Sequence, residues 1–221
     1  MSGFGVVVGL PAEARRLPAD PRLRVAVTGA DPEAAYRAAI RLAGEGVSAL
    51  ASVGVAAGLR ADLRSGDVVI GTTVTSPEDH DTIHCDKMLI DRLFAAVPRA
   101  RTGRLVTVLR PVMSPTEKAD LARRCEALAA DMESLAVLRA AAAAGLPAIV
   151  LRVVLDPADR AIPPSALAGG PGGGSPGAVA AALARRPWEI PAVIRLAGDY
   201  ARALASLRRA APALLALADE R

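Results

Sequence analysis

The 221-residue chain is 52% hydrophobic and 23% charged, with a net charge of +4, which is typical of a globular protein with a sizeable core. Its arginines are spread along the sequence without interleaved aromatic residues, so we expect no nucleic-acid groove. Cys85 and Cys125 are too few for a disulfide framework, and no apolar run reaches the roughly 18 residues of a membrane span. We therefore expect a cytoplasmic protein.

Six strands are predicted from short apolar runs. In chain order they cover residues 4–9, 24–28, 47–54, 67–74, 104–109 and 148–155. These runs do not alternate strictly between polar and apolar residues, which is typical of strands that are covered on both faces.

Helices are predicted between the strands, at residues 32–44, 86–96, 115–129 and 132–144. Asp31-Pro32 has the pattern of a helix start, and Ser114 and Glu117 have the spacing of a capping box. Residues 178–218 are predicted to be helical, with breaks near Pro187, Pro191 and Pro212. The alternation of strands and helices predicts one α/β domain over residues 1–221, a three-layer αβα arrangement with a mostly parallel, mixed central sheet.

Residues 163–177 are rich in proline and glycine, a composition typical of a flexible loop. This loop follows the predicted strand that ends before Asp156. A mobile loop over a site and an ordinary linker are equally good interpretations.

Polar residues follow several predicted strands, where open α/β sheets bind ligands. Glu13 follows the first strand, a small-residue turn at 54–58 follows the third, and Glu78, Asp81 and His84 follow the fourth. Glu133 opens a predicted helix, and Asp156 ends the last strand. Neither a Gly-x-Gly-x-x-Gly motif nor a Walker lysine is present, which argues against dinucleotide and triphosphate sites.

Simpler explanations exist for the individual residues. Asp156 could be only a loop cap before Pro157, and Glu133 only an acid favoured by the helix dipole. Their joint occurrence after successive elements favours a site. His80, His84 and Cys85 have no partner pair elsewhere, so we expect no metal.

Four motifs in fixed order resemble the superfamily of purine nucleoside phosphorylases and methylthioadenosine/adenosylhomocysteine nucleosidases. They lie at residues 52–59, 66–70, 131–134 and 151–159, and the resemblance covers residues 4–160. The continuation to Leu167 is similar to the branch of hopanoid-associated phosphorylases. That branch implies removal of adenine from adenosylhopane in hopanoid biosynthesis.

The resemblance implies a role for each matching residue. Asp156 would protonate the departing purine, and Met132 and Glu133 would hold the ribose. Glu13 would lie near the attacking water or the edge of the ribose, and Gly54 and the backbone beyond it, at Val55, would line the pocket for the nucleophile or the base. No cofactor is implied, although phosphate would be a co-substrate in a phosphorylase.

This chain departs from the family pattern at several positions. Val55 and Leu155 stand where the nucleosidases usually have hydroxyl residues, and an aromatic residue that stacks on the purine is missing. Val112 or Met113 is the expected substitute. Arg24 and Arg60 are candidate phosphate ligands only, so hydrolysis and phosphorolysis both stay open.

Two other functions are compatible with the sequence: a methylthioadenosine/adenosylhomocysteine nucleosidase with a smaller substrate, or a non-catalytic purine-binding module. The family resemblance also implies a homo-oligomer, a dimer or larger. The partner would be a small-molecule or lipid-linked nucleoside. The basic, amphipathic segment at residues 190–207 is a candidate for peripheral contact with the inner face of the membrane, or equally an ordinary terminal helix.

Overall fold

The computed structural model describes residues 3–78, 81–168, 170 and 176–218. Within this part of the chain the strands are β1 (Phe4–Val8), β2 (Leu23–Val27), β3 (Ala49–Gly58), β4 (Val68–Thr75), β5 (Thr82–His84), β6 (Arg101–Thr107), β7 (Ala129–Asp131) and β8 (Ala148–Val154). The helices are α1 (Pro11–Ala14), α2 (Pro32–Gly44), α3 (Lys87–Ala96), α4 (Pro115–Cys125), α5 (Ser134–Ala143), α6 (Pro176–Arg185), α7 (Ile190–Ala210) and α8 (Ala213–Ala218), with short 3₁₀ turns at Pro164–Leu167 and Pro187–Glu189.

The strands form one mixed sheet, part of which closes on itself. β2, β1, β3 and β8 are parallel neighbours in that order. β8 then pairs antiparallel with β4, which is parallel to β6, and β6 is parallel to β7. β7 returns to the end of β3 in antiparallel pairing, so β3, β8, β4, β6 and β7 form a ring.

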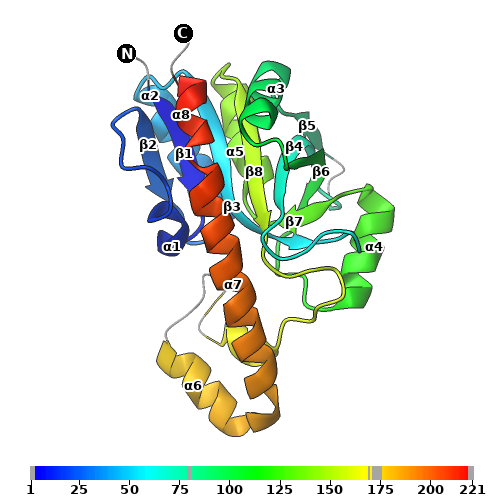
Figure 1. Ribbon diagram of the computed structural model, residues 1–221. Coiled ribbons are helices and arrows are strands. Elements are labelled where there is room, and N and C mark those ends of the chain that lie inside the picture. Colours follow the sequence, from blue (N-terminus) through cyan, green and yellow to red (C-terminus); the bar gives the residue numbers. More distant parts are fainter. Residues whose placement is uncertain (1–2, 79–80, 169, 171–175, 219–221) are drawn as a thin grey trace.

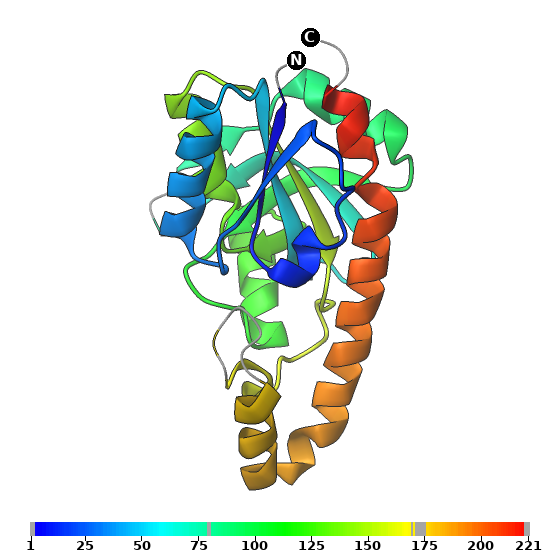
Figure 2. The ribbon, with the colours of Figure 1, turned by 90° about the vertical axis from the view of Figure 1, so that its left-hand side faces the viewer.

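Helices cover both faces of the sheet, which confirms the predicted three-layer α/β fold (Figures 1 and 2). On one face, Leu42 of α2 and Leu138 of α5 pack against strand residues such as Leu50. On the other face, Leu204 and Leu207 of α7 pack, together with α8, against β1, β3 and β8. The burial of both faces explains why the strand sequences are almost continuously apolar.

All six predicted strands are present, but several boundaries were wrong. Residues 54–58 continue β3 and form no turn, because they pair with β8 and β7. The helix predicted at 115–129 ends at Cys125, where Glu126 adopts a left-handed φ of 50°. Residues 129–131 then form β7, so the next helix begins at Ser134 and not at 132.

The C-terminal region is helical as predicted, and Pro187 and Pro212 interrupt it. Pro191 does not break α7, because it lies in the first turn, where a helix needs no hydrogen bond from the backbone nitrogen. Of the predicted loop at 163–177, Pro164–Leu167 form a 3₁₀ turn, while residues 169 and 171–175 lie outside the described residues.

α6 and the beginning of α7 extend away from the sheet and its covering helices (Figure 1). None of residues 176–198 is buried. In contrast, the second half of α7 packs into the core through residues such as Ala203 and Leu207. We call residues 176–198 the C-terminal arm.

Candidate active site

A pocket lies at the ends of β1, β7 and β8, beside the second half of β3. Seven of the residues predicted from the sequence line it: Glu13, Gly54, Val55, Val112, Met132, Glu133 and Asp156. They come from segments that are far apart in the chain, and the mixed sheet brings them together because the loops after β1, β7 and β8 open at the same place.

Glu13 is buried and held by backbone donors. Its Oε1 accepts a hydrogen bond from the Val55 nitrogen at 2.8 Å, and its Oε2 accepts one from the Leu10 nitrogen at 2.8 Å. Burial raises the pKa of Glu13, and the two backbone hydrogen bonds partly oppose this. Gly54 makes room for this carboxyl, because a Cβ at that position would lie 2.9 Å from Glu13 Oε1 and 2.9 Å from Arg152 Nη1.

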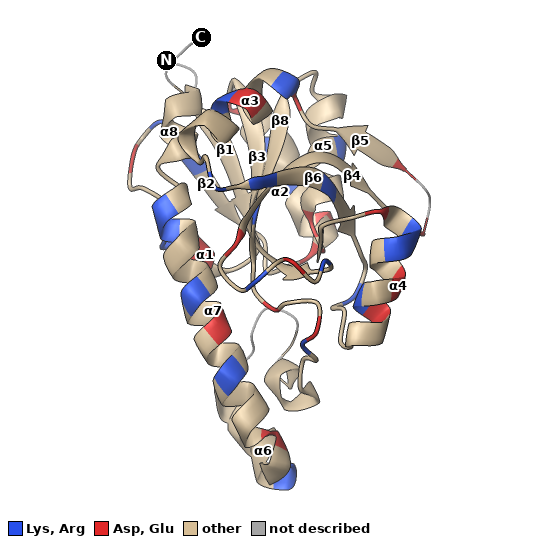
Figure 3. Cartoon of the chain, turned by 45° about the vertical axis from the view of Figure 1, so that its right-hand side comes forward, with Lys and Arg blue, Asp and Glu red and all other residues tan. Residues whose placement is uncertain are grey.

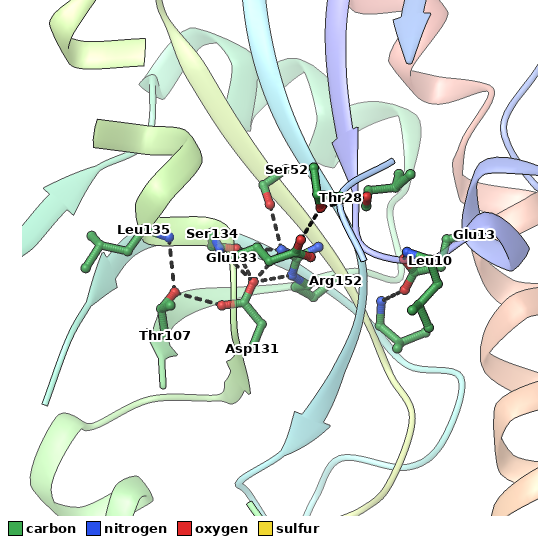
Figure 4. A network of polar contacts seen from close by, with 12 residues as sticks. Leu10, Glu13, Thr28, Ser52, Thr107, Asp131, Glu133, Ser134, Leu135 and Arg152 are labelled. Carbon is green, nitrogen blue, oxygen red and sulfur yellow. Dashed lines mark hydrogen bonds and ion pairs between the residues drawn. The ribbon is translucent and has the colours of Figure 1, made fainter. Parts of the chain in front are cut away.

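Glu133 is also buried, and its carboxyl lies beside Gly9. It accepts a hydrogen bond from the Thr28 hydroxyl, and a Cβ on Gly9 would lie 2.6 Å from Glu133 Oε2 (Figure 4). Burial raises the pKa of Glu133 to about 7, although the Thr28 hydroxyl and Arg152 lower it. Near neutral pH this carboxyl is therefore divided between a form that accepts hydrogen bonds and one that donates one.

Asp156 follows β8 and is almost fully buried. Its Oδ2 forms an ion pair with Lys118 of α4, whose side chain has no exposed surface. Burial raises the pKa of Asp156 to about 6, and Lys118 limits this increase. Lys118 was not among the site residues predicted from the sequence. A signal was present, since Lys118 is one of only two lysines among 27 basic residues.

A network of buried polar side chains forms part of the pocket wall (Figure 4). Arg152 forms an ion pair with Asp131 and donates hydrogen bonds to Ser52 Oγ at 2.6 Å and Ser134 Oγ at 2.9 Å. Asp131 also accepts a hydrogen bond from the Thr107 hydroxyl at 2.7 Å. Asp131 thus joins β6, β7, β8 and α5 and orients the backbone that leads to Glu133.

The rest of the pocket wall is apolar. It consists of Val108, Pro111, Val112, Leu155, Ile162 and Leu167, beside the polar end just described. Met113, the alternative to Val112, does not line the pocket. Its nitrogen donates to Glu117 Oε2 at 2.7 Å and its carbonyl accepts from the Ile162 nitrogen at 2.9 Å, so its backbone joins the start of α4 to the loop after β8.

Neither of the two candidate phosphate ligands reaches the pocket. Arg24 lies near the beginning of β2, paired with Glu45 at 3.3 Å, and Arg60 lies near Asp62 on the surface. Among the described residues, Arg152 is the only cation that lines the pocket.

The acids after β4 do not join the site either. Asp81 pairs with Arg139 at 2.8 Å, and Glu78 bonds Ser76. β4 runs antiparallel to β8, so its end points away from that of β8. His80 lies outside the described residues.

A family model described as the phosphorylase superfamily matches residues 21–170. The chain belongs to the phosphorylase superfamily. It is therefore an enzyme of this superfamily, as the four motifs predicted. No curated protein matches the sequence.

Solved structures of related enzymes share the fold. The 5'-methylthioadenosine/S-adenosylhomocysteine nucleosidase of Helicobacter pylori, in a structure with butyl-thio-DADMe-Immucillin-A, is 16% identical, with a TM-score of 0.73 over 100% of this chain and 99% of that one. The same enzyme from Neisseria meningitidis is 18% identical, with a TM-score of 0.73 over 97% and 99%. The futalosine hydrolase of Helicobacter pylori is 16% identical, with a TM-score of 0.72 over 100% and 98%.

Proposed function

We propose that this enzyme cleaves the N-glycosidic bond of a 5'-substituted adenosine and releases adenine. The observation that carries this proposal is the convergence of three buried carboxyl groups, those of Glu13, Glu133 and Asp156, on one pocket, each with a raised pKa. Pairs of titratable groups with shifted pKa values are typical of acid–base sites. The nucleosidase neighbours support the reaction class.

The proposed mechanism assigns one task to each carboxyl. Asp156 donates a proton to the purine as the base departs, and its pKa of about 6 leaves a protonated fraction near neutral pH. Glu133 accepts hydrogen bonds from the ribose hydroxyls and stabilises the positive charge that develops on the sugar. Glu13, which two backbone donors hold in place, orients the nucleophile.

Water is the nucleophile that the charges of the pocket favour. Phosphate is commonly bound by Arg or Lys side chains, and in the described part of the chain Arg152 is the only cation that lines the pocket. Its Nε and Nη2 are already bonded to Asp131, Ser52 and Ser134. We therefore propose hydrolysis over phosphorolysis.

An apolar 5' substituent fits the wall of the pocket. Ile162 and Leu167 come from the segment after Asp156 that is similar to the hopanoid-associated branch, and both line the pocket together with Pro111 and Val112. Adenosylhopane is accordingly the proposed substrate. Methylthioadenosine, with its small apolar 5' group, is the second candidate.

Adenine release tests these proposals directly. The enzyme is incubated with adenosine, methylthioadenosine, adenosylhomocysteine and adenosylhopane, with and without phosphate. We expect the fastest release from adenosylhopane, at the same rate without phosphate. A strict requirement for phosphate would contradict hydrolysis, and faster release from methylthioadenosine would favour the smaller substrate. If adenine is bound but no nucleoside is cleaved, the chain is a binding module.

We further propose that the C-terminal arm contacts an anionic membrane surface, where a lipid-linked nucleoside would reside. No described helix is long and apolar enough to cross a membrane. However, Trp188 and Ile194 are 72% and 67% exposed, and arginine residues recur along α7 (Figure 3). Arg185 and Arg195 are exposed, so both can reach lipid phosphates.

Co-sedimentation with liposomes that contain anionic lipids tests this contact. Trp188→Ala should weaken binding several-fold, because the indole would be lost from the bilayer interface. Phe94→Ala is the matched control, since Phe94 is an exposed aromatic residue on α3, outside the arm. Equal binding by wild type and both variants would end the proposal.

A further inference from the structure

Lys118 is buried in a helix that is otherwise largely polar. α4 begins at the Ser114 cap, and of its residues only Lys118 and Cys125 are buried. The ammonium group reaches the turn after β8 and donates to Asp156 Oδ2, to the Pro157 carbonyl at 2.8 Å and to the Arg160 carbonyl at 2.8 Å. The Asp156 carbonyl is a fourth and more distant acceptor, at 3.4 Å, so each of the three N–H groups of the lysine has a partner.

Such an arrangement is costly unless every donor is satisfied, because transfer of an ammonium ion out of water costs several kcal/mol. The backbone carbonyl acceptors alone would hold the turn at 156–160. The contact to the side chain of Asp156 also joins the ammonium group to a carboxyl that lines the pocket.

We propose that Lys118 is a positioning residue for the glycosidic cleavage: it fixes the orientation of the Asp156 carboxyl and sets the pH range over which that carboxyl carries the proton. The catalytic part of this proposal rests on the proposed function. The effect of Lys118 on the ionisation of Asp156 does not depend on the proposed function.

Other charged groups surround Asp156 from neighbouring elements. Asp199 of α7 opposes ionisation of Asp156, but it is itself paired with Arg160 at 3.0 Å and Arg202 at 2.6 Å. Glu13, Glu133, Asp131 and Arg152 also line the pocket. Of the described cations, Lys118 is the only one in an ion pair with Asp156. Removal of Lys118 therefore leaves only a backbone hydrogen bond to oppose the effects of burial and Asp199 on the pKa of Asp156.

The direct test is a carboxyl titration by ¹³C NMR with labelled aspartate, in which Asp156→Asn identifies the signal. In Lys118→Met the midpoint of Asp156 should increase by about one pH unit or more, the effect typical of a lost neighbouring charge. Lys118→Gln, which is neutral but still donates hydrogen bonds, should give a smaller increase and covers the case in which the Met variant does not fold. Lys118→Arg should keep the midpoint near that of the wild type.

The pH dependence of kcat/KM gives the second readout. If Asp156 acts as the acid, the alkaline limb of the profile should move to higher pH in Lys118→Gln, by the same amount as the NMR midpoint of that variant. A purely structural role would lower the rate at every pH without moving the limb. In the Asp156→Asn background, Lys118→Gln should have no further effect on the limb.

The two proposals fail in different ways. An unchanged NMR midpoint in Lys118→Met or Lys118→Gln overturns the role of Lys118, whatever the enzyme does with nucleosides. If the wild type releases no adenine but the midpoint increases as expected, the proposed function fails and the ionic role of Lys118 is supported.

Discussion

The carboxyl groups of the pocket destabilise the folded chain at the pH where they act. Burial raises the pKa of Glu133 to about 7 and that of Asp156 to about 6, so the folded state binds these protons more tightly than the unfolded state. The contribution of each group to stability is therefore fully present below its unfolded pKa. It is lost as the pH increases through the folded pKa.

Glu133→Gln should therefore stabilise the protein at high pH. We expect the free energy of unfolding to increase on the order of 1 to 3 kcal/mol at pH 8 and by much less at pH 5, where folded Glu133 is protonated. Urea unfolding at the two pH values measures the difference. Glu33→Gln, an exposed change on α2, is the control and should have little effect at either pH. Equal stabilisation by Glu133→Gln at both pH values would contradict a raised pKa.

Gly54→Ala should reduce catalysis without unfolding the chain. The added Cβ would lie 2.9 Å from Glu13 Oε1 and Arg152 Nη1, so both side chains must move. A displacement of about 1 Å at a catalytic group can cost roughly 10²-fold in rate, and we expect a loss of that order in adenine release. Gly44→Ala, at the end of α2, meets no atom within 4 Å and should leave the rate unchanged. Full activity of Gly54→Ala would show that Glu13 needs no fixed position.

At the scale of elements, the stability of α4 affects the position of the residues around Asp156. Its capping box at Ser114 and Glu117 was predicted from the sequence and is present. The helix carries Lys118 to Asp156, and the Met113 backbone joins it to the loop after β8. A loose first turn of α4 would therefore loosen the turn that carries the proposed proton donor.

Ser114→Ala should lower the free energy of unfolding by about 1 kcal/mol, the usual cost of an N-cap. The hydrogen bond from the Glu117 nitrogen to Ser114 Oγ, at 3.2 Å, is lost. Chemical denaturation measures this change. Ser114→Asp keeps a cap acceptor and should retain stability. An Ala variant as stable as the wild type would mean that the cap does not hold α4.

The elements that were mispredicted are short or depend on distant partners. β7 has three residues, and its strand conformation comes from pairing with β6 and the end of β3. Residues 54–58 have a pattern typical of turns, yet they continue β3 because they pair with β8 and β7. Such tertiary contacts have no periodic signal in the sequence.

For the whole molecule, the layers were predictable and the closure of the sheet was not. Apolar runs and caps identify strands and helices locally, whereas the ring from β3 through β8, β4, β6 and β7 depends on strand partners distant in sequence. The same reason explains why only some residues of the site were predicted from the sequence. Asp156, Glu133 and Glu13 follow strands and could be found, while Lys118 lies on a helix and reaches Asp156 only in the folded chain.

The pocket and the C-terminal arm are two separate regions of the molecule, with different proposed tasks. The pocket lies beside the sheet, whereas the C-terminal arm projects away from the sheet (Figure 2) and exposes Trp188 and Ile194. Changes in the arm should therefore alter membrane binding, and changes in the pocket should alter the chemical step.

The most direct test of the central claim is the rate of adenine release by Asp156→Asn under single-turnover conditions. Asparagine keeps the size of the side chain but has no acidic proton to give to the purine. We predict a rate at least about 10²-fold below that of the wild type, with adenine binding retained. A variant that releases adenine as fast as the wild type would contradict the assignment of Asp156 as the general acid.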